Sequence, residues 1–237
     1  MTNSTVSLAT LWVSDTYSLL AQHQNPTNAR NMSAYMKDRF AFLGIPKPAR
    51  AELQRRTWAG RPRGVAAIEA IHALWVIPVR EAQYVACDLI KSESKHWPPE
   101  EGLSALEAWI TAQSWWDSVD TLAVHGVGAL LRRHPDAVWP TVQRWISSEN
   151  MWLNRTAMIG QLGFRTETRT SWLDEALSAH IHSKEFFHRK AIGWALRDIA
   201  KLDRKSVQRF LKQHPQKNTV ATREAKRGIE ASHKRDS

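Results

Sequence analysis

Trp116 and Asp120 stand four residues apart in the segment SWWDSVD, which spans residues 114–120. On a helix this spacing places both side chains on one face. Trp115 shares a different face with Val119, so one indole can serve a core while the other stands beside a carboxylate. A partly desolvated carboxylate held by such packing can stabilise a developing cation or position a water molecule. The alternative is that Asp120 lies on the surface or caps a neighbouring helix.

The sequence contains twelve tryptophans. Most of them are expected in the core, because they stand at helical spacing with other apolar residues; these are Trp75, Trp109, Trp115, Trp139, Trp145 and Trp172. Trp116 and Trp194 differ, since their expected faces also carry charged side chains. The electron-rich face of an indole attracts a cation by roughly 0.5–2 kcal/mol. Core packing is the alternative for each of these two residues.

Arg155 belongs to a third helical segment, together with Trp152 and Ala157. Its planar guanidinium could bind a phosphate or a substrate anion, or it could form an ion pair within the protein. Other chemistries lack a matching pattern: the sequence has no HExxH motif, no Cys/His cluster, no P-loop, no GxGxxG and no GxSxG. We therefore expect neither a metal ion nor an organic cofactor.

The helical period of 3.6 residues dominates the chain, and strand-like alternation is nearly absent. Glycine and proline fall mostly between the periodic segments, where they end helices. In the first third of the chain this pattern predicts helices at about residues 6–23, 27–42, 48–57, 64–76 and 79–93. The fold class is therefore all-α.

Self-comparison reveals a repeat in the second half of the chain. MWLNRTAMIGQL, from Met151, aligns with EFFHRKAIGWAL, from Glu185, at an offset of 34 residues, and an offset of 36 places Trp116 over Trp152. Each of these segments follows another amphipathic segment: GLSALEAWITAQ, DAVWPTVQRWIS or SWLDEALSAHIH. A helix pair that recurs every 35–40 residues or so is typical of an α-solenoid built of HEAT-like repeats.

In such a superhelix the second helices of the pairs line a concave face. The segments that carry Trp116, Arg155 and Trp194 should then be neighbours on that face. We expect one domain over residues 1–237, of which the polar and basic segment 212–237 could fray.

The charge is distributed unevenly. The net charge is +10; residues 30–63 contribute +7, residues 184–237 contribute +9, residues 64–183 contribute −5, and Asp15 supplies the remaining −1. Two basic regions around an acidic middle suggest a polyanion held at two places, such as nucleic acid. The alternative is a basic surface without a particular partner.

The location of the protein follows from what the sequence lacks. Cys87 is the single cysteine, which excludes an intrachain disulfide and fits a reducing compartment. No basic residue precedes Arg30, and no apolar run approaches the ~18 residues that span a bilayer. We expect a soluble, cytoplasmic protein, most simply a monomer.

Several segments together resemble one family. SWWDSVD at 114–120, MWLNRTA at 151–157 and SKEFFHRKAIGWALRD at 183–198 are similar to the AlkD family of DNA alkylation repair proteins. NMSAYMKDRFAFLGI at 31–45 and LWVIPVREAQYVACDLI at 74–90 resemble the N-terminal part of the same family. The resemblance runs in order from about residue 20 to residue 211.

The resemblance implies a monofunctional DNA glycosylase of HEAT-like repeats that removes N3- and N7-alkylated purines without flipping the base. It implies that Asp120 is the catalytic aspartate and that Trp116 and Trp194 flank the lesion. It also implies DNA contacts by Arg155 and by Tyr35, and backbone contacts around residues 46–56. From the two basic regions we further expect DNA contacts by Lys47, Arg50, Arg189 and Lys190.

An alternative interpretation is a protein with the same solenoid fold but without catalytic activity. Solenoid surfaces are mostly binding surfaces, and the same basic groove would serve a non-catalytic binder of damaged or structured DNA. The combination of Asp120 with two tryptophans and Arg155 favours the enzyme. The sequence leaves open the preference between N3- and N7-adducts and the largest tolerated adduct.

Overall fold

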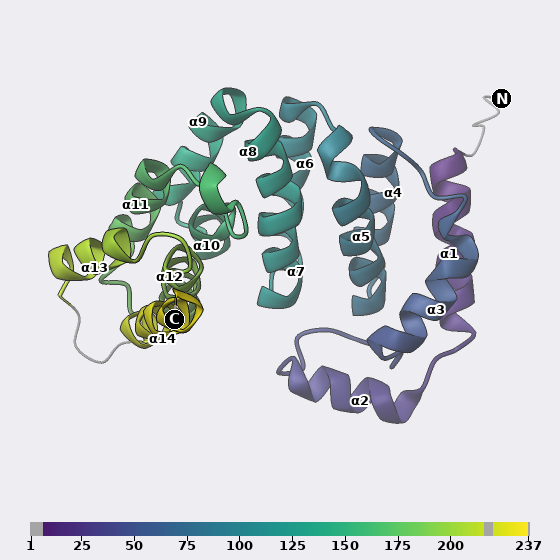
Figure 1. The fold of residues 1–237 in the computed structure, drawn as a ribbon. Coiled ribbons are helices and arrows are strands. Elements are labelled where there is room, and N and C mark those ends of the chain that lie inside the picture. The colour runs from purple at the N-terminus through teal and green to yellow at the C-terminus, as the bar shows by residue number, and fades with distance from the viewer. Residues whose placement is uncertain (1–6, 216–219, 237) are drawn as a thin grey trace. The chain divides into compact units, whose positions relative to one another are not determined.

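Apolar residues recur every three or four positions through most of the chain, and these segments form helices. The computed structural model describes residues 7–215 and 220–236, with side chains up to Ala231, and every regular element in these ranges is a helix (Figure 1). The all-α prediction is confirmed. The chain divides into two units, Met1–Pro98 and Pro99–Ser237. The expectation of one domain stays a prediction.

The first unit contains five α-helices and a short 3-10 turn among its described residues. They are α1 (Leu8–Ala21), α2 (Pro26–Tyr35), α3 (Lys47–Trp58), α4 (Ala66–Trp75), α5 (Arg80–Glu93) and η1 (Ser94–His96). Helix α4 packs on α1 and α5, and their apolar faces form the core of the unit. Helix α2 has no fully buried side chain, and its start is capped by Asn25, whose side chain accepts a hydrogen bond from the amide of Asn28.

The second predicted helix, 27–42, is too long. Helix α2 ends at Tyr35, because Lys37 and Asp38 adopt left-handed backbone conformations with φ of 60° and 55°. The amide of Asp38 donates to the carbonyl of Ser33, which closes the turn. Such a conformation cannot continue a right-handed helix.

The second unit is built mostly of successive helix pairs. Its helices are α6 (Pro99–Thr111), α7 (Trp116–Thr121), the π-helical segment η2 (Leu122–Val127), α8 (Gly128–Arg133), α9 (Pro135–Ile146), α10 (Met151–Ile159), the 3-10 turn η3 (Arg165–Glu167), α11 (Thr170–Ala179), α12 (Phe186–Ile199), α13 (Arg204–Gln213) and α14 (Val220–Asp236). In Figure 1, α9, α11 and α13 follow one another along one side of the unit, and α10, α12 and α14 along the other. Helix α10 packs on both α9 and α12. This arrangement fits the predicted α-solenoid, and the HEAT-like type of its repeats stays a prediction.

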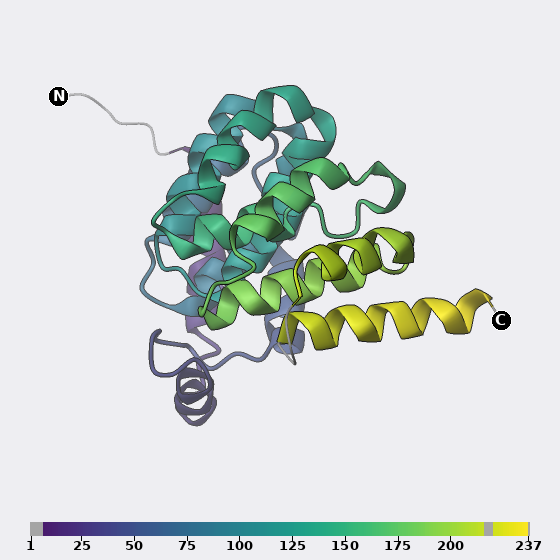
Figure 2. The ribbon, with the colours of Figure 1, turned by 90° about the vertical axis from the view of Figure 1, so that its left-hand side faces the viewer.

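The chain after Lys212 forms a further helix. Helix α14 lies beside α12, as the long yellow helix in Figure 2 shows, and Ala221, Ala225 and Gly228 are buried there. Residues 216–219 and 237, which belong to the segment expected to fray, lie outside the described residues.

The tryptophans expected in the core fall into two groups. Trp75, Trp109 and Trp145 are buried, as predicted. Trp115, Trp139 and Trp172 are only partly buried, and Trp139 and Trp172 stack on each other between α9 and α11, with ring centroids 4.4 Å apart. Offset or parallel ring contacts of this kind stabilise two neighbouring helices without full burial.

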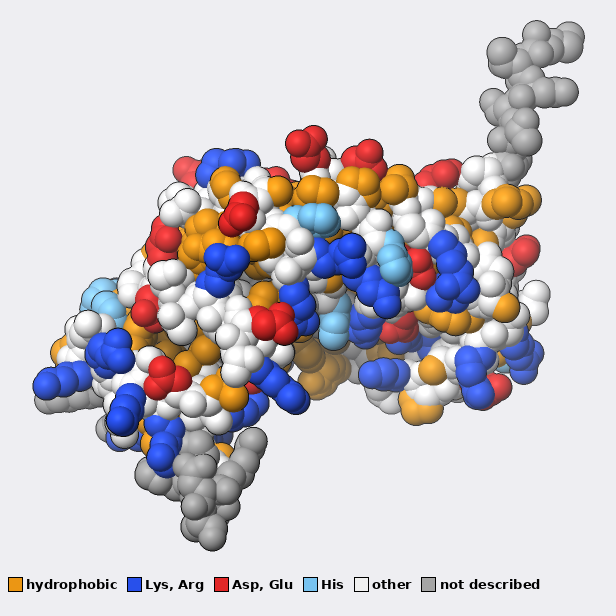
Figure 3. Space-filling view, turned by 45° about the horizontal axis from the view of Figure 1, so that its top comes forward, with side chains coloured by type: hydrophobic (Ala, Val, Ile, Leu, Met, Phe, Trp, Pro, Cys, Tyr) orange, Lys and Arg blue, Asp and Glu red, His pale blue; other side chains and the backbone are white. Residues whose placement is uncertain are grey.

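The surface carries charges of both signs. On the face shown in Figure 3, Lys and Arg side chains are interspersed with acidic ones. Within the described residues, no helix has both the length and the apolar character needed to cross a membrane.

Candidate active site

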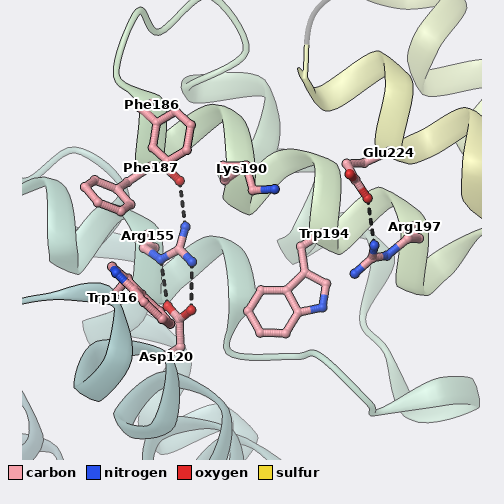
Figure 4. A pocket seen from close by; sticks show the side chains of 9 residues that line it. All are labelled: Trp116, Asp120, Arg155, Phe186, Phe187, Lys190, Trp194, Arg197 and Glu224. Atoms are coloured by element: carbon pink, nitrogen blue, oxygen red, sulfur yellow. Dashed lines mark hydrogen bonds and ion pairs between the residues drawn. The ribbon is translucent and has the colours of Figure 1, made fainter. Parts of the chain in front are cut away.

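A pocket of about 420 Å³ opens in the second unit, between α7, α10, α12 and α14. Its volume lies within the range typical of small-molecule sites. Figure 4 shows the nine residues that line it: Trp116, Asp120, Arg155, Phe186, Phe187, Lys190, Trp194, Arg197 and Glu224. The structure thus brings together Asp120, Trp116, Trp194 and Arg155, which the sequence singled out from three separate segments.

The two adjacent tryptophans separate because helix α7 begins between them. Trp115 is extended, with φ −159° and ψ 160°, and precedes the first helical residue. Its ring packs against Trp152 and Phe187, with centroids 5.8 and 5.2 Å away. Trp116 instead lines the pocket together with Asp120, one turn later. The prediction that one indole packs while the other stands beside the carboxylate is confirmed.

Asp120 and Arg155 form a bidentate ion pair. The Nε of Arg155 donates to Oδ1 of Asp120 over 2.7 Å, and Nη2 donates to Oδ2 over 2.8 Å. The side chain of Arg155 is 5% exposed and that of Asp120 is 19% exposed. Of the two roles left open for Arg155, the structure shows the intramolecular ion pair. A carboxylate can accept about four hydrogen bonds, so Asp120 keeps acceptor capacity beyond the two that Arg155 uses.

Two opposing influences act on the pKa of Asp120. Burial raises this pKa above its ordinary value, because the pocket disfavours the charged form. Hydrogen bonds and the positive charge of Arg155 lower it, and nearby Asp117 adds a smaller rise. The balance leaves the pKa raised. Arg155 therefore favours the anion in surroundings that penalise it.

The backbone of neighbouring helices holds Arg155 in place. Its Nη1 donates to the carbonyl of Phe187, at the start of α12, over 2.7 Å. Asn150 caps α10 by accepting a hydrogen bond from the amide of Trp152. Buried His188 joins α12 to its surroundings, with Nδ1 2.9 Å from the hydroxyl of Ser183. The guanidinium itself is held by the Asp120 carboxylate and the Phe187 carbonyl, while the other two contacts fix the start of α10 and of α12, from which Arg155 and Phe187 extend.

A second hollow of about 360 Å³ borders the same carboxylate. Asp120 and Trp194 line both spaces, and the second one is completed by Thr121, Val124, His125, Leu162, Gly163 and Asp198. Part of its wall comes from the π-helical segment η2, which directly follows α7. Single π-turns inside helices are frequent at functional sites. Asp120 therefore faces two spaces rather than one.

The expected DNA contacts of the N-terminal region belong to the first unit, whereas the pocket lies in the second. Tyr35 is 70% exposed, and Lys47 is exposed at the start of α3. The expected DNA contact by Arg50 needs correction, because this residue is only 5% exposed. Its Nη1 lies 3.1 Å from a carboxylate oxygen of Asp88, without hydrogen-bond geometry, and its guanidinium lies over the ring of Tyr84. Its Nε and Nη1 are therefore buried inside the first unit and are not available to DNA in this conformation.

Helix α12 supplies most of the pocket wall. Lys190 is exposed and lines the pocket. Arg189 does not line it, and its buried Nε has no hydrogen-bond partner in the described part of the chain. Sequence reasoning missed four lining residues: Phe186, Phe187, Arg197 and Glu224. The first three share a helix face with Lys190 and Trp194 at spacings of three and four, so this spacing could have identified them.

The described residues contain no group of three or more His, Cys, Asp or Glu side chains close enough to hold a metal ion. The pocket combines two carboxylates held by arginines, Asp120 and Glu224, with two indoles and several cations. The carboxylates and indoles of this pocket are suited to a cationic substrate group, and its Lys and Arg side chains to a polyanion.

The family comparison agrees with this chemistry. Residues 17–229 match the family described as DNA alkylation repair enzyme, so the chain belongs to that family. A solved structure, a predicted DNA alkylation repair enzyme from Enterococcus faecalis, is similar with a TM-score of 0.77 and 32% sequence identity. The alignment covers 85% of this chain and 94% of the other. None of the curated proteins compared with this chain matches it significantly. Membership supports a role in the repair of alkylated DNA.

Proposed function

We propose that the protein is a monofunctional DNA glycosylase that hydrolyses the N-glycosidic bond of cationic N3- and N7-alkylated purines in duplex DNA. One observation carries the proposal: the Asp120 carboxylate is fixed by Arg155 and lies with Trp116 and Trp194 in one pocket. Family membership provides the substrate class, since these proteins are repair enzymes for alkylated DNA.

The proposed chemistry needs only one carboxylate. An N3- or N7-alkylated purine already carries a positive charge and leaves with the electron pair of the C1′–N bond, which makes it neutral. The deoxyribose left behind resembles an oxocarbenium ion. Asp120 stabilises this cation, and the oxygen of a water molecule then bonds to C1′ while its proton passes through the carboxylate to solvent. Sugar hydrolases need a second carboxylic acid to protonate the leaving group, and this reaction does not.

The two indoles contribute to the same transition state. Trp116 and Trp194 line the pocket on different helices, α7 and α12, and can present their electron-rich faces to the deoxyribose. Each such contact stabilises a cation by about 0.5–2 kcal/mol, depending on how far water is excluded. Because this charge is larger in the transition state than in intact DNA, the contacts accelerate the reaction rather than only tightening binding.

The second hollow supplies the space for the attacking water. In this proposal the sugar occupies the larger pocket, and water reaches Asp120 from the side of Thr121 and Asp198. The two spaces share Asp120 and Trp194, so the carboxylate can contact the sugar and the water together. We propose that these residues act on the lesion from its backbone side, so that excision requires no base flipping.

Release of free base from a duplex that contains one N7-methylguanine tests the proposed activity. A glycosylase yields free base and an abasic site, whereas a non-catalytic binder of damaged DNA yields neither. The rate of base release is also expected to fall at acidic pH.

Excision should be lost as the pH falls through the pKa of Asp120, because the ionised carboxylate is the active form. Burial raises this pKa, so the acidic midpoint should lie above that of an ordinary aspartate, ~3.9. Arg155 lowers the same pKa, and Arg155→Met should therefore move the midpoint to higher pH. Single-turnover rates between pH 4 and 9, corrected for spontaneous base loss, measure both midpoints.

Arg155→Lys is the matched control, because it keeps the positive charge and should keep a midpoint close to that of the wild type. A midpoint in Arg155→Met that is equal to or lower than the wild-type midpoint would show that Arg155 does not hold Asp120 in its ionised form.

A further inference from the structure

Glycine residues let α14 approach α12 closely. A Cβ atom added at Gly193 would lie 2.9 Å from the Cβ of Glu224 and 3.1 Å from its Cγ. One added at Gly228 would lie 2.8 Å from the Cα of Arg197. Real side chains essentially never tolerate such distances, so both contacts require glycine. The close approach brings Glu224 of α14 to the wall of the pocket.

Glu224 is a nearly buried carboxylate with both oxygens engaged. Its side chain is 12% exposed. Oε2 accepts a hydrogen bond from Nη1 of Arg197 over 2.7 Å, and Oε1 accepts one from Nη1 of Arg227 over 3.0 Å. Figure 4 shows the first of these contacts at the opposite side of Trp194 from Asp120. The pocket therefore contains a second carboxylate that the proposed reaction does not use.

Arg197 is the cation that this carboxylate orients. Its side chain is 43% exposed and lines the pocket three residues after Trp194. Among the described residues, Glu224 is its one hydrogen-bond partner, and only Nη1 takes part. A guanidinium bound on one side in this way keeps N–H groups for a bidentate contact with a phosphate.

We propose that Glu224 is a positioning residue for DNA: it holds Arg197 beside Trp194, where the remaining N–H groups of Arg197 bind a backbone phosphate next to the lesion. This inference rests on the proposed function. It makes the C-terminal helix α14 a part of the DNA-binding site. Glu224 repels phosphate by its own charge, so its contribution to binding is entirely indirect.

This indirect role predicts that removal of the Glu224 charge weakens DNA binding, whereas simple electrostatics predicts that it tightens binding. Removal of a negative charge near DNA normally tightens binding, because fewer phosphates are repelled. Glu224→Gln should instead weaken binding to an undamaged duplex roughly tenfold, as loss of one charge-assisted contact does. It should also remove about 0.9 units from the slope of log affinity against log salt concentration.

Single and double variants test whether Glu224 acts on DNA binding through Arg197. Arg197→Ala should reproduce the effects of Glu224→Gln, and the double variant should be no weaker than either single variant, within about twofold. Glu230→Gln is the matched control, since Glu230 is an exposed glutamate on the same helix. It should bind as tightly as the wild type or more tightly.

A charge swap separates positioning from helix docking. Arg197→Glu combined with Glu224→Arg restores opposite charges between α12 and α14, so it should recover thermal stability. It should not recover binding, because the residue beside Trp194 would then be an anion. Full recovery of DNA affinity in the swap would show that the ion pair only holds the helices together.

Two further results would overturn the inference: binding by Glu224→Gln as tight as or tighter than the wild type, or additive effects of the two single variants. These binding measurements do not require catalysis. If the wild type binds but releases no N7-methylguanine, the proposed glycosylase is wrong, while the pairing of Glu224 with Arg197 is still judged by the salt slopes. If the wild type releases base and the slopes are unchanged, only the positioning role fails.

Discussion

Asp120→Asn is expected to lower the single-turnover rate of base excision by about 10²–10³-fold, the usual loss when a transition-state charge loses its electrostatic partner. The carboxylate is the one anion placed between Trp116 and Trp194, and Asn keeps its size without its charge. DNA binding should persist, because the substitution removes a negative charge from a site that receives phosphates. Excision rates and dissociation constants on one duplex with N7-methylguanine measure both quantities.

Asp174→Asn is the matched control. Asp174 lies on α11, burial also raises its pKa, and it does not line the pocket. It should excise at the wild-type rate. In Asp120→Asn, Arg155 loses the anion that compensates its burial, which could unfold the protein. The variant must therefore be shown to be folded, by a cooperative thermal transition, before its rate is compared. A folded Asp120→Asn variant with a rate within about threefold of the wild type would remove Asp120 from the mechanism.

The second large effect concerns the choice of lesion. If the protein recognises the deoxyribose and the positive charge of the lesion, it should release cationic purines rapidly. It should release hypoxanthine and ethenoadenine no faster than background. These neutral bases need a general acid to leave. Asp120 accepts hydrogen bonds from Arg155, and Glu224 accepts them from two arginines, so neither carboxylate is placed to donate a proton.

Bulky cationic adducts should also be released, because no base-shaped pocket limits their size in this mechanism. A flipping enzyme with a snug pocket predicts the opposite order, limited by adduct size and tolerant of neutral bases that it can protonate. One duplex series at fixed sequence and salt, with small cationic, bulky cationic and neutral lesions, distinguishes the two. Efficient release of hypoxanthine together with rejection of bulky N7-adducts would favour the flipping mechanism.

The sequence predicted the residues of the site better than their contacts. The face shared by Trp116 and Asp120 follows from helical spacing, and the 34-residue offset correctly placed Arg155 and Trp194 on neighbouring helices. Whether Arg155 would bind phosphate or an internal carboxylate could not be decided, because a guanidinium forms bidentate hydrogen bonds with either anion. That choice depends on the distance between α7 and α10, which no local pattern encodes.

Two other features depended on tertiary structure. Glu224 lies in the polar and basic C-terminal segment, and its place in the pocket depends on the close approach at Gly193 and Gly228. Arg50 carried the right charge for DNA but is buried against Asp88 and Tyr84. Charge alone predicts a partner for a surface, and it cannot tell which basic side chains remain on that surface.

The most direct test of the proposed function is the release of free base from a duplex with a single N7-methylguanine, measured with enzyme in excess and compared with the same duplex without protein. The predicted result is stoichiometric release of N7-methylguanine with an equal yield of abasic sites, far above the spontaneous rate and without added metal or cofactor. Tight binding of this duplex with base loss no faster than the spontaneous rate would contradict the account and identify a binder of damaged DNA.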